Sequence, residues 1–146
     1  MRDHRPSDFE SLYRLDQLCF TTGIAYSRAA LKQFLSLKSA AAIVAIEGKE
    51  VAGFVIAQKT REGAGHIITL DVHPRSRRAK LGSTLLEAAE KRMAALGAKA
   101  MLLEVAVDNT PAITFYNRHG YSVLRSLPRY YLDSLDGLLM GKKFGT

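Results

Sequence analysis

Residues 70–82 read Leu-Asp-Val-His-Pro-Arg-Ser-Arg-Arg-Ala-Lys-Leu-Gly, and they join two different apolar patterns. Before them, residues 66–72 form an apolar, β-branched run that stops at Pro74, which is typical of a strand. From about residue 79 to 96 the apolar residues recur with helical spacing. The stretch therefore predicts a strand, a short loop and a helix. Four cations lie in the loop: Arg75, Arg77, Arg78 and Lys80.

Cations at the start of a helix reverse the usual preference, because the free amides and the dipole of a helix N-terminus favour negative charge. A surplus of positive charge there, with Gly82 beside it, predicts a site for a phosphorylated ligand. The alternative is a solvated basic loop. Neither G-x-x-x-x-G-K-[ST] nor a G-x-G-x-x-G after a strand is present, so two common phosphate motifs are excluded.

The pattern on both sides of this stretch predicts an α/β fold. Strands are expected at residues 41–46, 51–58, 66–72, 100–107, 121–126 and 135–143, and helices after Ser7, after Ser27, from 79 to 96 and from 110 to 120. Ser7 and Glu10 are expected to form a capping box, and Ser27 a helix cap. Three consecutive strands followed by βαβ units predict a mixed central sheet with helices on both faces and its parallel pairing near the middle.

The length and composition predict a single globular domain over residues 1–146. Hydrophobic residues make up 47% of the chain, too many for a disordered protein. A single cysteine favours a reducing compartment, and no apolar run reaches the roughly 20 residues of a membrane helix, so we expect a cytoplasmic protein. The four histidines show no metal-ligand spacing, so no metal is expected. The net charge of +7 also fits a ribosome- or nucleic-acid-binding module, but basic and aromatic residues do not alternate, which makes nucleic acid unlikely.

Glu104 is the only charge in the apolar run of residues 100–107. Burying an unpaired carboxylate is costly, so this side chain is expected to be paired, protonated or open to water. One interpretation is a structural ion pair. The other is a general base that takes the proton of an amine through a water molecule. An α-amine has a pKa near 8 against about 10.4 for lysine, so its deprotonation is about 3 kcal/mol easier.

Tyr116 and Asn109 follow the Glu104 strand. Tyr116 has helical spacing with Ala112 and Phe115, so the simplest interpretation is a core residue. Its helix comes directly after the strand, however, and a phenol can protonate a departing thiolate. Asn109 lies at the strand-to-helix turn, where turn chemistry alone explains an asparagine.

The loop stretch resembles the acyl-coenzyme A signature of the GCN5-related N-acetyltransferases, which runs from a strand through V-x-P to [RQ]-x-x-G-x-[GA]. The resemblance implies that this family's fold is present, that the backbone of Leu70 and Val72 pairs with the pantetheine arm of acetyl-CoA, and that the following loop holds the pyrophosphate. The implied loop residues are Arg77, Arg78, Ala79, Lys80, Leu81, Gly82 and Ser83. Lys80 replaces the usual glycine of the signature.

A second set of motifs is similar to the bacterial ribosomal-protein-alanine N-acetyltransferases: Leu103-Glu104-Val105, Asp108-Asn109, Ala112-Ile113, Phe115-Tyr116 and Gly120-Tyr121. This likeness implies that Glu104 accepts a proton, Tyr116 donates one and Asn109 contacts coenzyme A.

The first-helix segment that ends at Phe20 and the pair Tyr130-Tyr131 also resemble that group, which implies a role in binding the acceptor. The expected reaction is direct transfer of acetyl to a protein α-amine, such as that of a ribosomal protein. The alternatives are a small-molecule amine as acceptor, a non-catalytic coenzyme A-binding protein, and a basic ribosome- or nucleic-acid-binding module.

Overall fold

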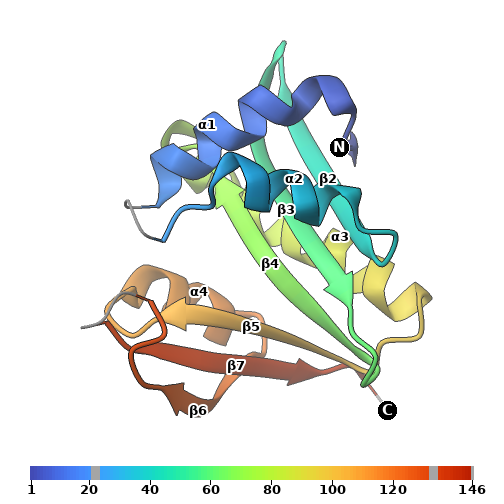
Figure 1. Cartoon of the computed structure of the whole chain (residues 1–146). Coiled ribbons are helices and arrows are strands. Elements are labelled where there is room, and N and C mark those ends of the chain that lie inside the picture. Colours follow the sequence, from blue (N-terminus) through green and yellow to red (C-terminus); the bar gives the residue numbers. More distant parts are fainter. Residues whose placement is uncertain (21–23, 132–134, 146) are drawn as a thin grey trace.

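The computed structural model describes residues 1–20, 24–131 and 135–145, with the backbone alone at Arg78 and Ala79. It contains a seven-stranded mixed sheet of order β1-β2-β3-β4-β5-β7-β6 (Figure 1). The strands are β1 (Arg2–Asp3), β2 (Ala40–Glu47), β3 (Glu50–Lys59), β4 (Ala64–Val72), β5 (Ala100–Ala106), β6 (Ser122–Leu127) and β7 (Gly137–Lys143). Only the central β4–β5 pair is parallel among these, which confirms the predicted place of the parallel pairing.

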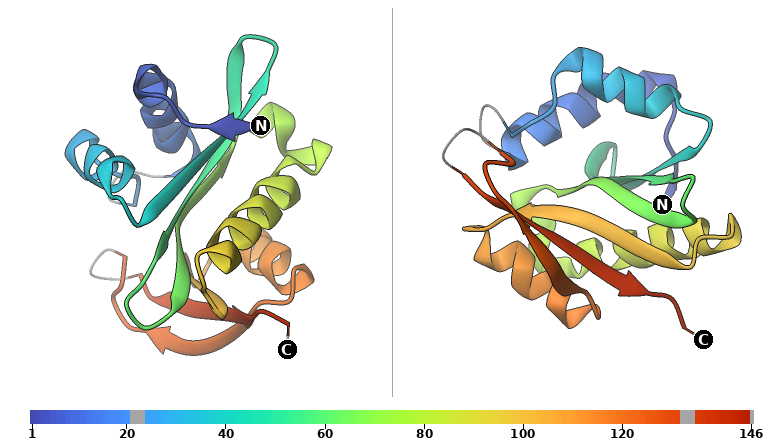
Figure 2. Two further views of the ribbon diagram at one scale, coloured as in Figure 1. Left: turned by 90° about the vertical axis from the view of Figure 1, so that its right-hand side faces the viewer. Right: turned by 60° about the horizontal axis from the view of Figure 1, so that its bottom comes forward.

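Helices cover both faces of the sheet, as predicted. They are α1 (Phe9–Cys19), α2 (Arg28–Ser36), α3 (Leu81–Ala95) and α4 (Thr110–Arg118), with short 3-10 helices η1 (Pro6–Asp8) and η2 (Pro74–Ala79). Figure 2 shows α1 and α2 on one side and α3 and α4 on the other. Each side has its own buried cluster: Leu12, Leu15 and Leu31 pack on β2 and β3 on the first, and Leu85, Leu86 and Met93 on the second.

Side chains fix the helix ends in ways that partly differ from expectation. Ser27 Oγ accepts a hydrogen bond from Ala30 N at 3.1 Å, so this predicted cap is confirmed. The predicted capping box of Ser7 and Glu10 is wrong. Asp8 instead accepts a hydrogen bond from the backbone N of Arg5 at 2.6 Å, and η1 precedes α1.

The parallel strands β4 and β5 pair over only three residues. The register runs from Ala64–Ala100 to His66–Leu102, and beyond His66 the two strands separate, as Figure 1 shows. Backbone groups on the facing edges then have no ladder partner, although buried amides and carbonyls require one. The separation therefore creates a place in the middle of the sheet where another backbone-like group can bind.

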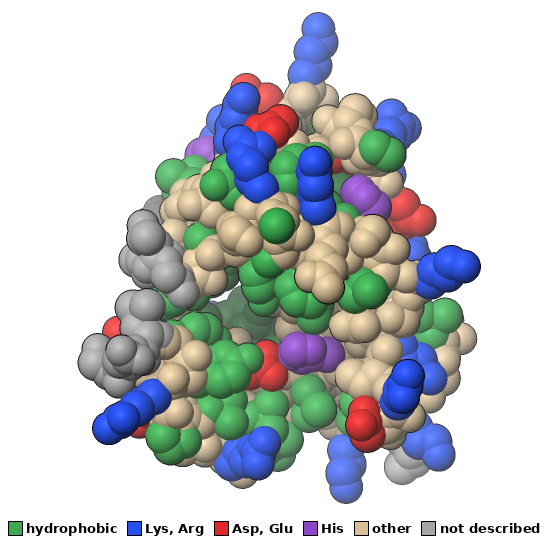
Figure 3. All heavy atoms as spheres, viewed as in Figure 1, with side chains coloured by type: hydrophobic (Ala, Val, Ile, Leu, Met, Phe, Trp, Pro, Cys, Tyr) green, Lys and Arg blue, Asp and Glu red, His purple; other side chains and the backbone are tan. Residues whose placement is uncertain are grey.

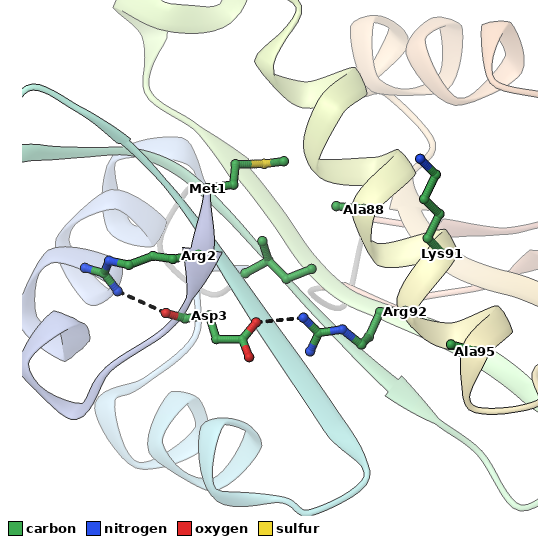
Figure 4. A pocket seen from close by; sticks show the side chains of 8 residues that line it. Met1, Arg2, Asp3, Ala88, Lys91, Arg92 and Ala95 are labelled. Carbon is green, nitrogen blue, oxygen red and sulfur yellow. Dashed lines mark hydrogen bonds and ion pairs between the residues drawn. The ribbon is translucent and has the colours of Figure 1, made fainter.

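An ion pair connects the N-terminal strand β1 to α3, which lies on the side of the sheet opposite α1. Asp3 Oδ1 pairs with Arg92 at 2.7 Å, and a shallow groove lies between β1 and α3, with Met1, Ala88 and Ala95 on its walls (Figure 4). Within the described residues, no helix is both long enough and apolar enough to cross a membrane.

Candidate active site

Glu104 lies where β4 and β5 separate, and its partner is His66. His66 is in register with Leu102, two residues before Glu104, so all three side chains lie on the same face of the sheet. His66 Nε2 is 2.7 Å from Glu104 Oε1, and the two side chains are 29% and 18% exposed. Glu104 is thus paired, as the structural interpretation expects, and it is partly open to solvent, which the general-base interpretation requires.

Three tyrosines gather around Glu104. The rings of Tyr130 and Tyr131 meet edge to face, with their centroids 4.8 Å apart, and Tyr26 donates from its hydroxyl to the Ile68 carbonyl at 3.1 Å. Burial raises the pKa of all three phenols, and the nearby Glu104 carboxylate raises it further. These neutral phenols are hydrogen-bond donors beside the carboxylate.

Tyr116 lies on the opposite face, on α4. Its side chain is only 9% exposed and belongs to the buried cluster under α3 and α4, with the Tyr121 ring 5.7 Å away. Burial raises the pKa of its phenol, and the charge of Asp71 adds to the rise. Tyr116 belongs to the same cluster as Leu103 and Val105, whose side chains alternate with that of Glu104, so it lies across β5 from the carboxylate.

The end of β4 presents its backbone toward the opening. His73 N donates to Ala52 O on β3 at 2.8 Å, and because backbone groups alternate along a strand, those of Val72 and Leu70 point the other way, toward β5. The Val72 carbonyl accepts hydrogen bonds from Arg77 Nε at 3.1 Å and from Cys19 Sγ at 3.4 Å. Burial raises the Cys19 pKa to about 11, so this residue is a neutral donor.

The N-terminus of α3 has an unusual residue before it. Lys80 adopts the left-handed conformation with φ 59° and ψ 20°, the region that glycine favours, and its carbonyl accepts the first helical bond, from Thr84 N at 3.1 Å. The amides of Leu81, Gly82 and Ser83 therefore precede the hydrogen-bonded turns. A Cβ on Gly82 would lie 3.4 Å from Phe115, so glycine lets α3 approach α4 closely.

The predicted cluster of four cations is divided by the fold. Arg75 pairs with Glu50, and Arg77 turns back to the Val72 carbonyl, whereas Lys80 is exposed. Arg75 and Arg77 thus have partners within the chain, and the role of this loop as a phosphate site stays a prediction. The side chains of Arg78 and Ala79 lie outside the described residues.

The other predicted residues lie at element ends. Asn109 Oδ1 accepts a hydrogen bond from Ala112 N at 3.3 Å and caps α4, as turn chemistry predicts. Phe20 is half-buried directly after α1. Ser83 Oγ is 2.9 Å from Nε2 of His119, which links the start of α3 to the end of α4. Among the described residues no group of three His, Cys, Asp or Glu side chains is arranged to hold a metal ion.

Sequence reasoning missed two important carboxyl groups behind this site. Asp16 on α1 is 0% exposed and Asp71 on β4 is 1% exposed, and Thr69 Oγ1 contacts both of them. Burial and the neighbouring Asp16 raise the pKa of Asp71 well above its ordinary value, so Asp71 retains its proton more readily than an exposed aspartate. Asp16 also accepts a hydrogen bond from Tyr26 N at 2.7 Å, so the acid pair fixes the segment that brings Tyr26 to Glu104.

The missed residues Tyr26 and His66 carry weak local signals. His66 is a polar residue at the start of an apolar strand, and its partner is 38 residues away in the sequence. Tyr26 precedes the cap Ser27 and follows a segment with no periodic pattern. Only the pairing of β4 with β5 and the packing of α1 reveal their positions.

Comparison with known proteins places this geometry in a family. The model of the acetyltransferase (GNAT) family matches residues 9–121. An N-alpha-acetyltransferase of Sulfurisphaera tokodaii is 28% identical over 96% of this chain and 90% of its own length. Ard1 from Thermoplasma volcanium has a TM-score of 0.89 and 29% identity over 99% of this chain and 97% of that structure.

The fold is also shared with the ribosomal-protein-S18-alanine N-acetyltransferase of Escherichia coli, which has a TM-score of 0.87 and 20% identity over 99% of this chain and 92% of that one. The strand, loop and helix at residues 70–82 and the separation of β4 from β5 thus lie within a matched family region. The chain belongs to the acetyltransferase (GNAT) family and is an acetyl-CoA-dependent N-acetyltransferase.

Proposed function

We propose that the acceptor is the α-amino group of a protein N-terminus, and more narrowly that of a ribosomal protein. The names of the Sulfurisphaera and Thermoplasma relatives support the first statement, and the motifs around Glu104 and Tyr116 support the second. We also propose a cytoplasmic location, because the single cysteine is a free thiol.

The residues present fit acetyl-CoA. The backbone of Leu70 and the Val72 amide, which lie beyond the paired part of β4 and β5, suit the amide-bearing arm of the molecule, and the amides of Leu81, Gly82 and Ser83 suit its pyrophosphate. Acetyl-CoA supplies the activated acyl group as a thioester. The chain's own contribution is to place a strand amide near the thioester carbonyl, where it stabilises developing negative charge.

Glu104 and Tyr116 divide the proton transfers. Glu104 accepts the proton of the acceptor amine through a water molecule, and His66 holds the carboxylate in place. Because an α-amine gives up its proton about 3 kcal/mol more easily than lysine does, a carboxylate suits this acceptor. Tyr116, whose raised pKa keeps its phenol protonated, donates to the departing thiolate from the other side of the opening.

The observation that carries the proposal is the Glu104–His66 pair at the point where β4 and β5 separate. A partly exposed carboxylate with an imidazole partner and three phenols around it is arranged to receive a proton. It lies on the same face as Tyr130, whose ring packs over β7. This face is where an acceptor can approach.

A peptide assay tests the acceptor. Each peptide carries one internal lysine and has either a free or a formylated N-terminus, and polyamines and free amino acids serve as small acceptors. We expect acetyl only on the free α-amine, located by mass spectrometry, and none on formylated peptides. A second arm compares N-termini of ribosomal proteins with scrambled versions. Acetylation of lysine or of small amines at equal or higher kcat/KM contradicts the proposed acceptor.

A further inference from the structure

One face of β5, β7 and β6 is left bare by the described helices. The α1 and α2 side of the core includes residues of β2, β3 and β4, whereas α3 and α4 lie behind the sheet. In Figure 3 hydrophobic side chains gather over the lower strands, next to an acidic and a histidine side chain. The bare surface is therefore apolar and adjoins the reactive groups.

Two glycines on β7 shape this face. Tyr130 packs over Gly137, with its Cβ 3.0 Å from where a glycine Cβ would stand. Leu124 and Leu102 meet over Gly141, at 2.8 and 2.9 Å from the corresponding point. Any larger residue would displace these side chains, so the glycines keep a low, continuous apolar surface. We call Tyr130, Leu139, Leu102 and Leu124 the β7 strip.

The reactive carboxylate lies within the β7 strip, between Tyr130 over Gly137 and Leu124 over Gly141. Glu104 is in register with Leu139, and Leu102 with Gly141, so Glu104, Leu139 and Gly141 share one face. Gly141 lies two residues beyond Leu139, which is about 7 Å along the strand. An extended acceptor whose amine lies at Glu104 covers this distance with its third and fourth residues.

Two large apolar side chains of the β7 strip are exposed to solvent. Leu124 is 55% exposed and Tyr130 50% exposed. Arg125, also exposed, is in register with Leu139 because a bulge inserts Leu124 into β6. It forms no ion pair in the described part of the chain. An apolar row with an available cation fits a segment that carries an apolar and an acidic side chain.

We propose that the β7 strip binds the acceptor chain downstream of its amino terminus, with an apolar side chain at the third or fourth residue over Leu124 and an acidic neighbour near Arg125. This inference rests on the proposed function, because it requires a polypeptide acceptor. The enzyme then selects an acceptor by the side chains of its third and fourth residues, which do not contact Glu104, as well as by its free amine. We assign the acceptor as the ligand of the β7 strip because the strip is continuous with Glu104, where the acceptor amine lies.

Matched peptides test the strip. The peptides share their first two residues and carry Leu-Glu or Ser-Gln at positions three and four. The chain is expected to acetylate the Leu-Glu peptide with a KM about tenfold lower and a similar kcat, because a partly buried leucine contributes that much to binding. Leu124→Ser is expected to remove most of this difference, and Arg125→Gln only the part due to glutamate.

Val123→Ser is the control, because Val123 is 48% exposed on the same strand but in register with the buried Met140, on the other face. It is expected to keep the full tenfold preference. Equal KM values for the two peptides, or equal losses in the Leu124 and Val123 variants, overturn the inference while the proposed function stands. Turnover of neither peptide contradicts the proposed function and the inference with it. If the unchanged chain is a dimer and Leu124→Ser makes it a monomer, the β7 strip is a self-association surface, and the inference is overturned.

Discussion

At the scale of single residues, the left-handed Lys80 is the clearest departure from the usual acyl-coenzyme A loop. A side chain at φ 59° costs about 1–2 kcal/mol relative to the right-handed region. The chain nevertheless keeps the turn that glycine would make, so the lysine amide and carbonyl retain their positions at the start of α3. Lys80 is exposed and directly precedes the amides proposed to bind the pyrophosphate.

Lys80→Gly is expected to stabilise the protein by up to about 1 kcal/mol, because the relieved backbone strain exceeds the entropy that glycine adds to the unfolded chain. Urea unfolding measures the change. Lys91→Gly, within α3, is the control and is expected to lower the free energy of unfolding by about 1 kcal/mol. Equal losses of stability in the two variants would show that Lys80 carries no backbone strain.

At the scale of elements, the acid pair connects α1 to β4 and so to the site. Asp71 on β4 and Asp16 on α1 are both buried, and Asp16 also holds the backbone of Tyr26. The raised pKa of Asp71 means that the folded state keeps a proton that the unfolded state releases above a pKa of about 3.9. The stability due to this proton is complete below that value and is lost as the pH rises toward the folded pKa.

Asp71→Asn is expected to remove this pH dependence. Between pH 5 and 8 the free energy of unfolding of the unchanged chain falls with a slope of at most about 1.4 kcal/mol per pH unit from this proton, and that of the variant falls less steeply. Thermal or urea unfolding over this range measures both slopes. Asp8, whose pKa is lowered to about 2 by Arg2, titrates below the range and does not interfere. Parallel pH profiles for the two proteins contradict a raised pKa of Asp71 in the folded state.

At the scale of the whole molecule, the succession of helices and strands and the central parallel pair were predictable, because each element has a local pattern and short connections limit the topology. The placement of β7 between β5 and β6 was not among the predictions. The roles of Glu104 and Tyr116 stay predictions: Glu104 lies where β4 and β5 separate, and Tyr116 lies in the buried cluster under α3 and α4. His66 and Asp16 were not predictable, because their partners lie 38 and more residues away and are set by strand register and helix packing.

The structure also changes how the cations of the loop after β4 are interpreted. The sequence concentrates cations at the loop after β4, but ion pairs and carbonyl contacts formed across the fold engage Arg75 and Arg77. The helix amides and the open strand edge, rather than the number of cations, are therefore the main support for coenzyme A binding there. Exposed cations such as Arg125 remain available for the acceptor.

In the proposed mechanism Glu104 accepts the amine proton and Tyr116 protonates the thiolate. The most direct measurement is kcat/KM for an N-terminal peptide with the unchanged chain, Glu104→Gln and Tyr116→Phe, together with the Kd for acetyl-CoA by calorimetry. Each variant is expected to lose at least tenfold in kcat/KM, about 1.4 kcal/mol or more of transition-state stabilisation, while the Kd stays within about twofold. Full activity in both variants would contradict the assigned mechanism.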